Sequence, residues 1–268
     1  MLTILAQNFA IMLLIFFGVW LISVMIKDAS IVDILWGPSL AIPALLTYFF
    51  QGGQGPRALL LTVLVSIWAF RLGSYLAVRN LGHGEDFRYQ AMRQKAGSDA
   101  AFARQSLVRV YFLQCVISFF VSLPVQVGQF GSHPVFANGS VGLGPLALLG
   151  AVIFMIGLGF EAIGDAQLRA FKKDPANQGK LMDRGLWAWT RHPNYFGDSA
   201  VWFGLFLIAV ESRWGYVTVL SPVVMFIFLY FLSGKGLLEK LMARKYPEYE
   251  AYKERVSGFF PWPPKPVS

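Results

Sequence analysis

Seven apolar stretches, separated by polar segments, dominate the hydrophobic pattern of this 268-residue chain. They cover roughly residues 4–26, 30–50, 57–79, 107–130, 141–163, 195–211 and 214–233. A helix needs about twenty apolar residues to cross a bilayer, and the ten-residue alternation typical of a membrane β-barrel is absent from the sequence. The pattern therefore predicts an all-α polytopic membrane protein, a bundle of seven transmembrane helices.

Composition supports this class. Hydrophobic residues make up 56% of the chain and charged residues 14%, against about 25% charged in an average soluble domain. The first apolar stretch lacks a preceding basic region and a small-residue cleavage site, so we expect a retained helix rather than a signal peptide. A single cysteine, Cys115, excludes an intramolecular disulfide and a cysteine metal cluster. The three histidines (His83, His133 and His192) are far apart, so no metal site is expected.

The basic residues orient the bundle. With seven spans, alternate connections share one side of the membrane, and most of the 23 Lys and Arg residues fall in the first, third and fifth connections and the tail. Only Arg57 and Arg213 fall in the opposite connections. The positive-inside rule then puts the N-terminus outside and the C-terminus in the cytoplasm. We expect a bacterial inner-membrane protein, and no nucleic-acid partner for so apolar a chain.

Ionisable residues inside spans are costly and usually mark function. In this topology they all fall in the cytoplasmic halves of the predicted spans: Asp33, Arg71, Glu161, Asp198, Lys235 and Glu239. We expect them to converge on one polar cavity open to the cytoplasm. Snorkelling near helix ends is an alternative for Lys235 and explains Arg79, but it accounts less well for Asp33 and Arg71.

The segment at residues 181–202, LMDRGLWAWTRHPNYFGDSAVW, is the densest polar patch beside an apolar stretch. Its polar side chains are Asp183, Arg184, Arg191, His192, Asn194, Tyr195 and Asp198. Pro193 is favoured in a first helical turn, so free backbone N–H groups would lie beside Arg191 and His192, where an anion can bind. The alternative is a basic, aromatic juxtamembrane belt, but a belt does not need Asn194, Tyr195 and Asp198 in one turn.

Helical spacing groups further charges. Glu161, Asp165 and Arg169 recur every four residues, with Lys172 three further on, so they share one helix face. Lys235 and Glu239 repeat the spacing. Either set alone is compatible with an ion-paired surface; together with the segment at 181–202 they predict walls of a site for a large, multiply charged ligand. Residues 82–89, GHGEDFRY, form another polar cluster, whose glycines indicate a turn that could close over such a ligand.

Two other segments, the glycines at 157–164 and the tail, do not match the motifs of soluble enzymes. Gly157, Gly159 and Gly164 have the wrong spacing for a dinucleotide fingerprint and are typical of close helix packing. The tail from residue 246 to 264 is rich in aromatics and proline. Its Tyr246 and Tyr249 suit stacking on a planar ring or, equally, an interfacial cap.

Three motifs resemble a known family: DILWG at 33–37, GLWAWTRHPNYFGDSAVWFG at 185–204 and KGLLEKLMARKYPEYEAYKERV at 235–256. They resemble the steroid 5α-reductase superfamily, in its bacterial branch. RHPNYFG and KYPEY are also similar to isoprenylcysteine carboxyl methyltransferase and phospholipid methyltransferases. Reductases of the superfamily are seven-helix membrane proteins that use NADPH to reduce a carbon–carbon double bond conjugated to a carbonyl.

The resemblance implies roles for particular residues. The family's cofactor-contacting asparagine and acid correspond to Asn194 and Asp198, its fifth-helix acid and arginine to Asp165 and Arg169, and its tail tyrosine to Tyr246. Where the animal steroid enzymes carry His and Tyr on the last helix, this chain has Lys235 and Glu239. Asp33 suits the carbonyl-binding acid, but Trp68 occupies the register of the partner tyrosine, and Tyr75 lies two turns on.

The prediction is an NADPH-dependent reductase of a lipid-soluble enone such as a 3-oxo-Δ4 steroid, which enters from the bilayer and the surrounding membrane lipids. We expect a monomer with one domain, residues 1–130 mainly on the substrate side and 141–268 mainly on the cofactor side. Asp33 and Tyr75 are the catalytic candidates, although Asp33 would alternatively only neutralise Arg71. The predicted cofactor-binding residues are Arg71, Glu161, Asp165, Arg169, Lys172, Arg184, Arg191, His192, Asn194, Tyr195, Asp198, Lys235, Glu239 and Tyr246. The alternatives are an S-adenosylmethionine-dependent membrane methyltransferase and a non-catalytic transporter or lipid-binding protein.

Overall fold

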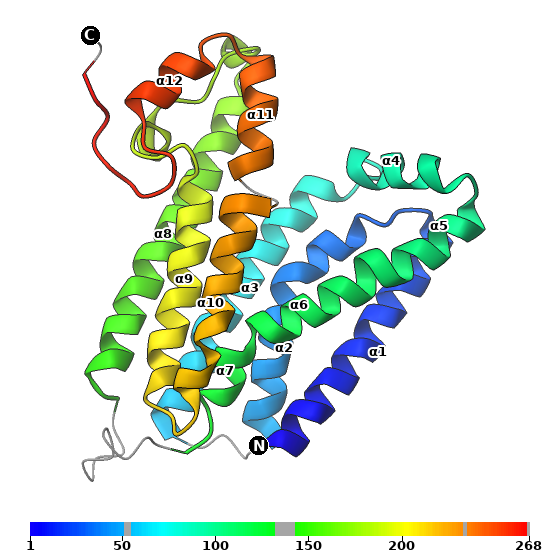
Figure 1. The fold of residues 1–268 in the computed structure, drawn as a ribbon, viewed down its shortest axis with the longest axis vertical. Helices are drawn as coiled ribbons and strands as arrows, with labels where there is room; N and C mark the ends of the chain where they lie inside the picture. Colours follow the sequence, from blue (N-terminus) through cyan, green and yellow to red (C-terminus); the bar gives the residue numbers. More distant parts are fainter. Residues whose placement is uncertain (51–54, 132–142, 233–234, 267–268) are drawn as a thin grey trace. The chain divides into compact units, whose positions relative to one another are not determined.

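The computed structural model describes residues 1–50, 55–131, 143–232 and 235–266, which are helical with no strand among them (Figure 1). The chain divides into two compact units, which we describe separately. Unit 1 comprises residues 1–147 and 208–218, and unit 2 comprises residues 148–207 and 219–268. His133 lies outside the described residues.

The helices follow one another along the chain. The first group is α1 (Leu2–Ile26), α2 (Ile31–Phe50), α3 (Gly55–Asn80), α4 (Phe87–Ala96), α5 (Asp99–Ser106), the π-helical η1 (Leu107–Phe112), α6 (Leu113–Val121) and α7 (Leu123–Val127). The second group is α8 (Pro145–Lys173), the short η3 (Pro175–Asn177) and η4 (Gly185–Ala188), α9 (Pro193–Val210), η5 (Gly215–Val219), α10 (Leu220–Ile227), the π-helical η6 (Phe228–Leu232), α11 (Lys235–Lys245) and α12 (Tyr249–Arg255).

Among the described residues, four helices, α1, α2, α3 and α8, are long and apolar enough to cross a membrane. The other three predicted spans are also helical, but they are shorter or divided. The fourth is interrupted by the π-helical η1 and again before Pro124, and the last is divided among η5, α10 and η6. Proline lacks the N–H that a continuous helix requires. For the part of the chain that the structure describes, the all-helical prediction is confirmed, and the long apolar helices support an integral membrane protein. Seven spans and their orientation remain predictions.

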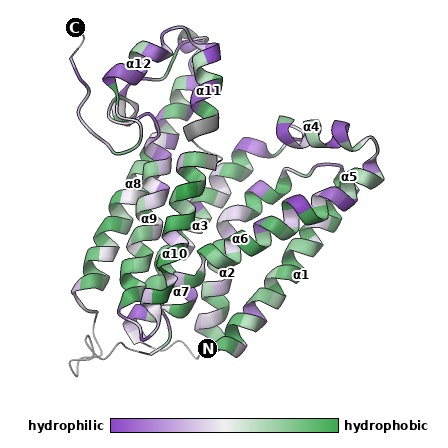
Figure 2. Ribbon diagram, in the orientation of Figure 1, coloured by the Kyte–Doolittle hydropathy of each residue, from purple (hydrophilic) through white to green (hydrophobic). Residues whose placement is uncertain are grey.

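Polar residues gather at the ends of these helices. Figure 2 shows the hydrophilic colour concentrated on α4 in unit 1 and on α11 and α12 in unit 2, while the long helices are mostly hydrophobic. The helices α4 and α12 were not among the apolar stretches, because their sequences FRYQAMRQKA and YEAYKER have no apolar run.

In unit 1, α2 packs against α1, α3, α6 and α7. The backbones of α2 and α3 approach closely at Gly37, where a Cβ atom would lie 2.9 Å from the Ala69 carbonyl oxygen. A buried amide links three helices: Asn8 Nδ2 donates to Thr47 Oγ1 at 2.8 Å and to Gln126 Oε1 at 2.9 Å. Such hydrogen bonds hold helices together where the surroundings are apolar.

A second polar contact in unit 1 involves Arg57, a basic residue in a predicted outer connection, and Glu211. Arg57 Nε donates to the Gly128 carbonyl at 2.8 Å, and its Nη1 donates to the Glu211 carbonyl at 3.0 Å. The Glu211 carboxylate, whose residue is 2% exposed, accepts from the backbone N–H groups of Gly144 and Ala147, both at 2.9 Å. Glu211 thereby satisfies free N–H groups at the start of α8.

In unit 2, glycine residues allow α8 and α9 to approach each other closely. A Cβ atom at Gly157 would lie 2.6 Å from the Gly197 carbonyl oxygen, and one at Gly164 would lie 3.1 Å from the Pro193 ring. The predicted packing role is confirmed for Gly157 and Gly164. Gly159, by contrast, has nothing within 4 Å of its Cβ position. This close approach brings the first turn of α9 against the middle of α8.

Candidate functional site

The junction of α8 and α9 in unit 2 joins two of the predicted cofactor residues. Asn194 Nδ2 donates to Asp165 Oδ1 at 3.1 Å. The residues Glu161, Asp165 and Asp198 are 3%, 4% and 8% exposed. Three carboxyl groups that are this buried, with an amide held by one of them, form a polar site at the entrance to α9.

Exposed cations follow the acids along α8. Arg169 and Lys172 lie one and nearly two turns beyond Asp165, and both are exposed. They are therefore accessible to a charged ligand at this junction. Tyr195, the next residue after Asn194, is partly buried, and its ring stacks on His192 with 5.5 Å between centroids and an interplanar angle of 2°.

Arg191 is buried in an ion pair that sequence spacing did not reveal. Its Nε donates to Glu239 Oε1 at 2.9 Å, and its Nη1 donates to the carbonyls of Val256 at 2.6 Å and Lys253 at 3.1 Å. His192 Nε2 lies 3.3 Å from the same carboxylate oxygen. One guanidinium thus fastens α11 and the end of α12 to the segment before α9.

The electrostatics of this pair favour the charged carboxylate. Burial of Glu239 opposes ionisation, but the hydrogen bond from His192 and the positive charge of Arg191 outweigh it and lower the pKa of Glu239 below its ordinary value. Burial also raises the pKa of Tyr249 to about 12, with the charge of Glu239 adding to the effect. The predicted residues Arg191, His192 and Glu239 do lie together, in an arrangement that holds the C-terminal segment.

The remaining predicted residues of unit 2 are more dispersed. The exposed Arg184 donates to Asn177 Oδ1 at 3.3 Å and lines a cavity of about 990 Å³ between residues 180–184, α12 and the tail. Tyr246 is partly buried against the cluster formed by Leu181, Tyr249, Tyr252 and Val256. Lys235 is the first residue of α11, and its side chain lies outside the described part.

In unit 1, Asp33 is held by two residues of α4. Arg88 Nη2 donates to Asp33 Oδ2 at 2.6 Å, and the Tyr89 hydroxyl donates to Asp33 Oδ1 at 2.8 Å. The side chain of Asp33 is 14% exposed and Tyr89 is 6% exposed. Burial, followed by the charge and hydrogen bond of Asp33, raises the pKa of Tyr89. Tyr89 therefore keeps its proton near neutral pH.

The other two candidates of unit 1 lie on α3. The Arg71 guanidinium carbon is 5.5 Å from the centre of the Tyr75 ring, and that of Arg79 is 6.0 Å from it. Asp33 forms an ion pair with Arg88. The family resemblance placed the partner tyrosine on the third span, and Tyr89, on α4, was not predicted. The signal for Tyr89 was the polar run at 82–89.

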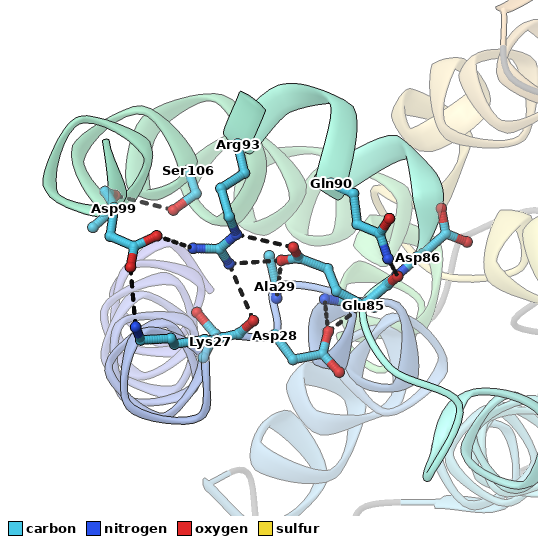
Figure 3. Close-up of polar contacts among 12 residues, drawn as sticks. Lys27, Asp28, Ala29, Glu85, Asp86, Gln90, Arg93, Asp99 and Ser106 are labelled. Atoms are coloured by element: carbon cyan, nitrogen blue, oxygen red, sulfur yellow. Dashed lines mark hydrogen bonds and ion pairs between the residues drawn. The ribbon is translucent and has the colours of Figure 1, made fainter. Parts of the chain in front are cut away.

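A network around Arg93 fixes that run to the turn between α1 and α2 (Figure 3). We call residues 85–93 with these contacts the α4 latch. Glu85 Oε1 accepts from the Ala29 N–H at 2.9 Å and from Arg93 Nη2 at 2.8 Å. Arg93 Nη1 also donates to Asp99 Oδ1 at 3.1 Å, and Asp99 pairs with Lys27 at 3.2 Å. The latch thus holds Arg88 and Tyr89 over the first turn of α2.

Within the described ranges, no three His, Cys, Asp or Glu side chains are grouped so that they could hold a metal ion. The clusters around Asp165 and around Asp33 contain carboxyl, amide and phenol groups, with basic side chains nearby.

Comparison with known proteins defines the family. A family model described as "Protein of unknown function (DUF1295)" matches residues 19–256, and the chain belongs to this family. An uncharacterised protein of Schizosaccharomyces pombe is 25% identical over 272 residues, covering 90% of this chain and 75% of that protein. A probable O-methyltransferase of Ustilaginoidea virens, ustE, is 39% identical over 59 residues, which are 22% of this chain and 21% of that protein. No solved structure gives a significant match.

Proposed function

We propose that this protein is an NADPH-dependent reductase of the carbon–carbon double bond of a lipid-soluble enone, such as a 3-oxo-Δ4 steroid. The observation that carries the proposal is the 3.1 Å hydrogen bond between Asn194 and Asp165. The resemblance to the steroid 5α-reductase superfamily assigns both positions to cofactor contact, and they come from different helices. The proposal includes that superfamily's bacterial branch, seven spans and a cofactor site that faces the cytoplasm.

The residues at this junction fit a dinucleotide. The phosphates of a dinucleotide require cations, and Arg169 and Lys172 are exposed on α8 beyond Asp165; arginine in particular matches phosphate geometry. Arg191 is different: its donors bind Glu239 and two backbone carbonyls. We therefore assign Arg191 to the C-terminal segment rather than to the phosphates. Bound NADPH would supply the hydride.

In unit 1, we propose that Tyr89, positioned by Asp33, donates a hydrogen bond that polarises the substrate carbonyl. As the enone is reduced, negative charge grows on its oxygen, and a donor aimed at that oxygen lowers the barrier. Tyr89 stays protonated and can donate. In the described conformation its O–H binds Asp33, so a substrate carbonyl would take that hydrogen bond while Asp33 stays paired with Arg88. Tyr75 is the second candidate for the donor.

A membrane methyltransferase is the second candidate function. The observation that favours it is the 59-residue match to a probable O-methyltransferase. Such an enzyme would transfer the methyl group of S-adenosylmethionine to a lipid or prenylated substrate. That cofactor has no phosphate and a single carboxylate, so it would need fewer cations than the phosphates of NADPH.

Binding measurements separate the candidates. Purified protein is titrated with NADPH and with S-adenosylmethionine, followed by nicotinamide fluorescence and calorimetry, and then assayed with progesterone or testosterone. The reductase predicts micromolar or tighter NADPH binding, weak S-adenosylmethionine binding and a saturated product. Tight S-adenosylmethionine binding without NADPH binding would favour the methyltransferase. Binding of neither would indicate a non-catalytic transporter or lipid-binding protein.

The anchoring residues are tested by substitution. Asn194→Ala and Arg169→Ala should each weaken NADPH binding by about 1–3 kcal/mol, the scale of a hydrogen bond to a charged group. Lys173→Ala, an exposed change beside Lys172, is the matched control and should bind normally. Unchanged affinity in Asn194→Ala and Arg169→Ala, in well-folded protein, would remove both from the site.

A further inference from the structure

The tail after α12 is bound to the segment before α9 along its length. The Ser257 carbonyl accepts from the Arg191 N–H at 2.9 Å, and the Phe259 carbonyl accepts from Thr190 Oγ1 at 2.8 Å. Further on, the Trp262 N–H donates to the Trp189 carbonyl at 3.0 Å. These bonds give the tail a defined position within unit 2.

This fixed tail presents large aromatic side chains outward. Phe259 is 3% exposed and packs against Phe226 and other rings, whereas Phe260 and Trp262 are 64% and 72% exposed. Trp189, whose carbonyl binds the Trp262 N–H, is 47% exposed. We call Trp189, Phe260 and Trp262 the tail aromatic patch. Contiguous exposed apolar patches mark contact with a membrane or a partner.

The segment that leads to Trp189 is attached to α8, and the point of attachment indicates where the patch lies relative to the bilayer. α8 begins at Pro145, and about twenty residues of helix cross the hydrocarbon of a bilayer, which brings the helix to the neighbourhood of Gly164. There, Trp187 Nε1 donates to the Gly164 carbonyl at 3.0 Å, and the Leu186 N–H donates to Gln167 Oε1 at 2.9 Å. The segment that leads to Trp189 is therefore attached where α8 leaves the apolar layer.

We propose that the tail aromatic patch lies in the headgroup region of the bilayer that α8 crosses, and that it contacts anionic phospholipid there. Tryptophan is enriched at this boundary because its ring is apolar and its N–H is polar. The tail also carries a cation: Lys265 follows Trp262 by three residues, and its N–H donates to the Arg255 carbonyl at 3.0 Å. Basic groups near a membrane surface attract anionic headgroups. The tail therefore anchors unit 2 at the membrane surface, independently of the reaction catalysed.

The test measures the depth of the tail in a bilayer. In a Cys115→Ala background, which removes the native thiol, a nitroxide is attached to Phe260→Cys or to Trp262→Cys, and the full-length protein is placed in nanodiscs of phosphatidylcholine and phosphatidylglycerol. Glu250→Cys on α12 is the control, because its side chain is 66% exposed and lies outside the patch. Labels at 260 and 262 should collide more often with oxygen than with a water-soluble nickel chelate, and the label at 250 should show the reverse.

Each substitution removes one ring of the patch, so the two labels serve as checks on each other. If both report the same aqueous exposure as position 250, the membrane contact is wrong. Repeating the measurement in phosphatidylcholine alone tests the anionic component: shallower labels support it, and unchanged depth overturns that component.

Discussion

Substitution of Arg191 tests whether this residue holds the C-terminal segment or binds the cofactor. Arg191→Met keeps the length of the side chain but removes its charge, leaving Glu239 with His192 and leaving the carbonyls of Lys253 and Val256 without their donor. Removing one partner of a buried ion pair costs about 3–5 kcal/mol. The side chain of Glu239 is 17% exposed, so water relieves part of that cost, and we expect about 3 kcal/mol.

The loss should be local. Because Arg191 holds α11 and the end of α12, its removal should open the C-terminal segment before the rest of the protein unfolds. Limited proteolysis should cut Arg191→Met within residues 246–265 under conditions that leave the wild type intact. Adding Glu239→Gln should restore part of the resistance, because the buried charge is gone. The matched variant Arg169→Met should resist proteolysis normally and lose NADPH affinity instead.

A particular result would refute this reasoning. If Arg191→Met kept wild-type resistance and thermal stability but lost NADPH binding, the guanidinium would belong to the cofactor site.

Three further predictions concern other groups. Asp33→Asn should reduce enone turnover about a hundredfold while NADPH still binds, and Tyr89→Phe should behave alike; wild-type turnover in both would exclude this pair from catalysis. Glu211→Ala should lower stability by about 1–3 kcal/mol, measured by thermal unfolding in detergent, with no effect on NADPH affinity per folded molecule. Because the folded pKa of Glu239 lies below its ordinary 4.5, its contribution should be complete above about pH 4.5 and lost as pH falls through the folded pKa. Acid should thus promote C-terminal proteolysis in the wild type, and this pH dependence should be weaker in Glu239→Gln.

The sequence predicted helices well because burial in an apolar layer requires long apolar runs. The runs that became α1, α2, α3 and α8 stand out by length alone. The interruptions were harder to foresee: Pro124 and the π-helical η1 divide a run that is continuous in hydropathy. Short polar helices such as α4 carry no such signal, since their stability comes from tertiary contacts rather than from an apolar stripe.

The site was predicted less completely, for a related reason. Spacing shows which residues share a helix face, so Asp165 and Arg169 could be grouped, and the family resemblance added Asn194. Pairings between distant segments are invisible to spacing. Glu239 lies 48 residues from Arg191, and Tyr89 lies 56 residues from Asp33. Both pairings change what a charged residue does, because a guanidinium engaged by a buried acid is no longer free for a ligand.

The α4 latch has a consequence for biosynthesis. Its contacts join Lys27, Ala29 and Asp33 to residues 85–93 and Asp99, so every partner has been synthesised before η1 begins. Chains fold from the N-terminus as they emerge, and these polar contacts need nothing from the later part of the chain, whereas the burial of Tyr89 is completed by Val110, Tyr111 and Cys115. Once the hairpin of α2 and α3 has formed, the latch can close and tie its two open ends together. The first three helices would then be joined to one another before the later helices are synthesised.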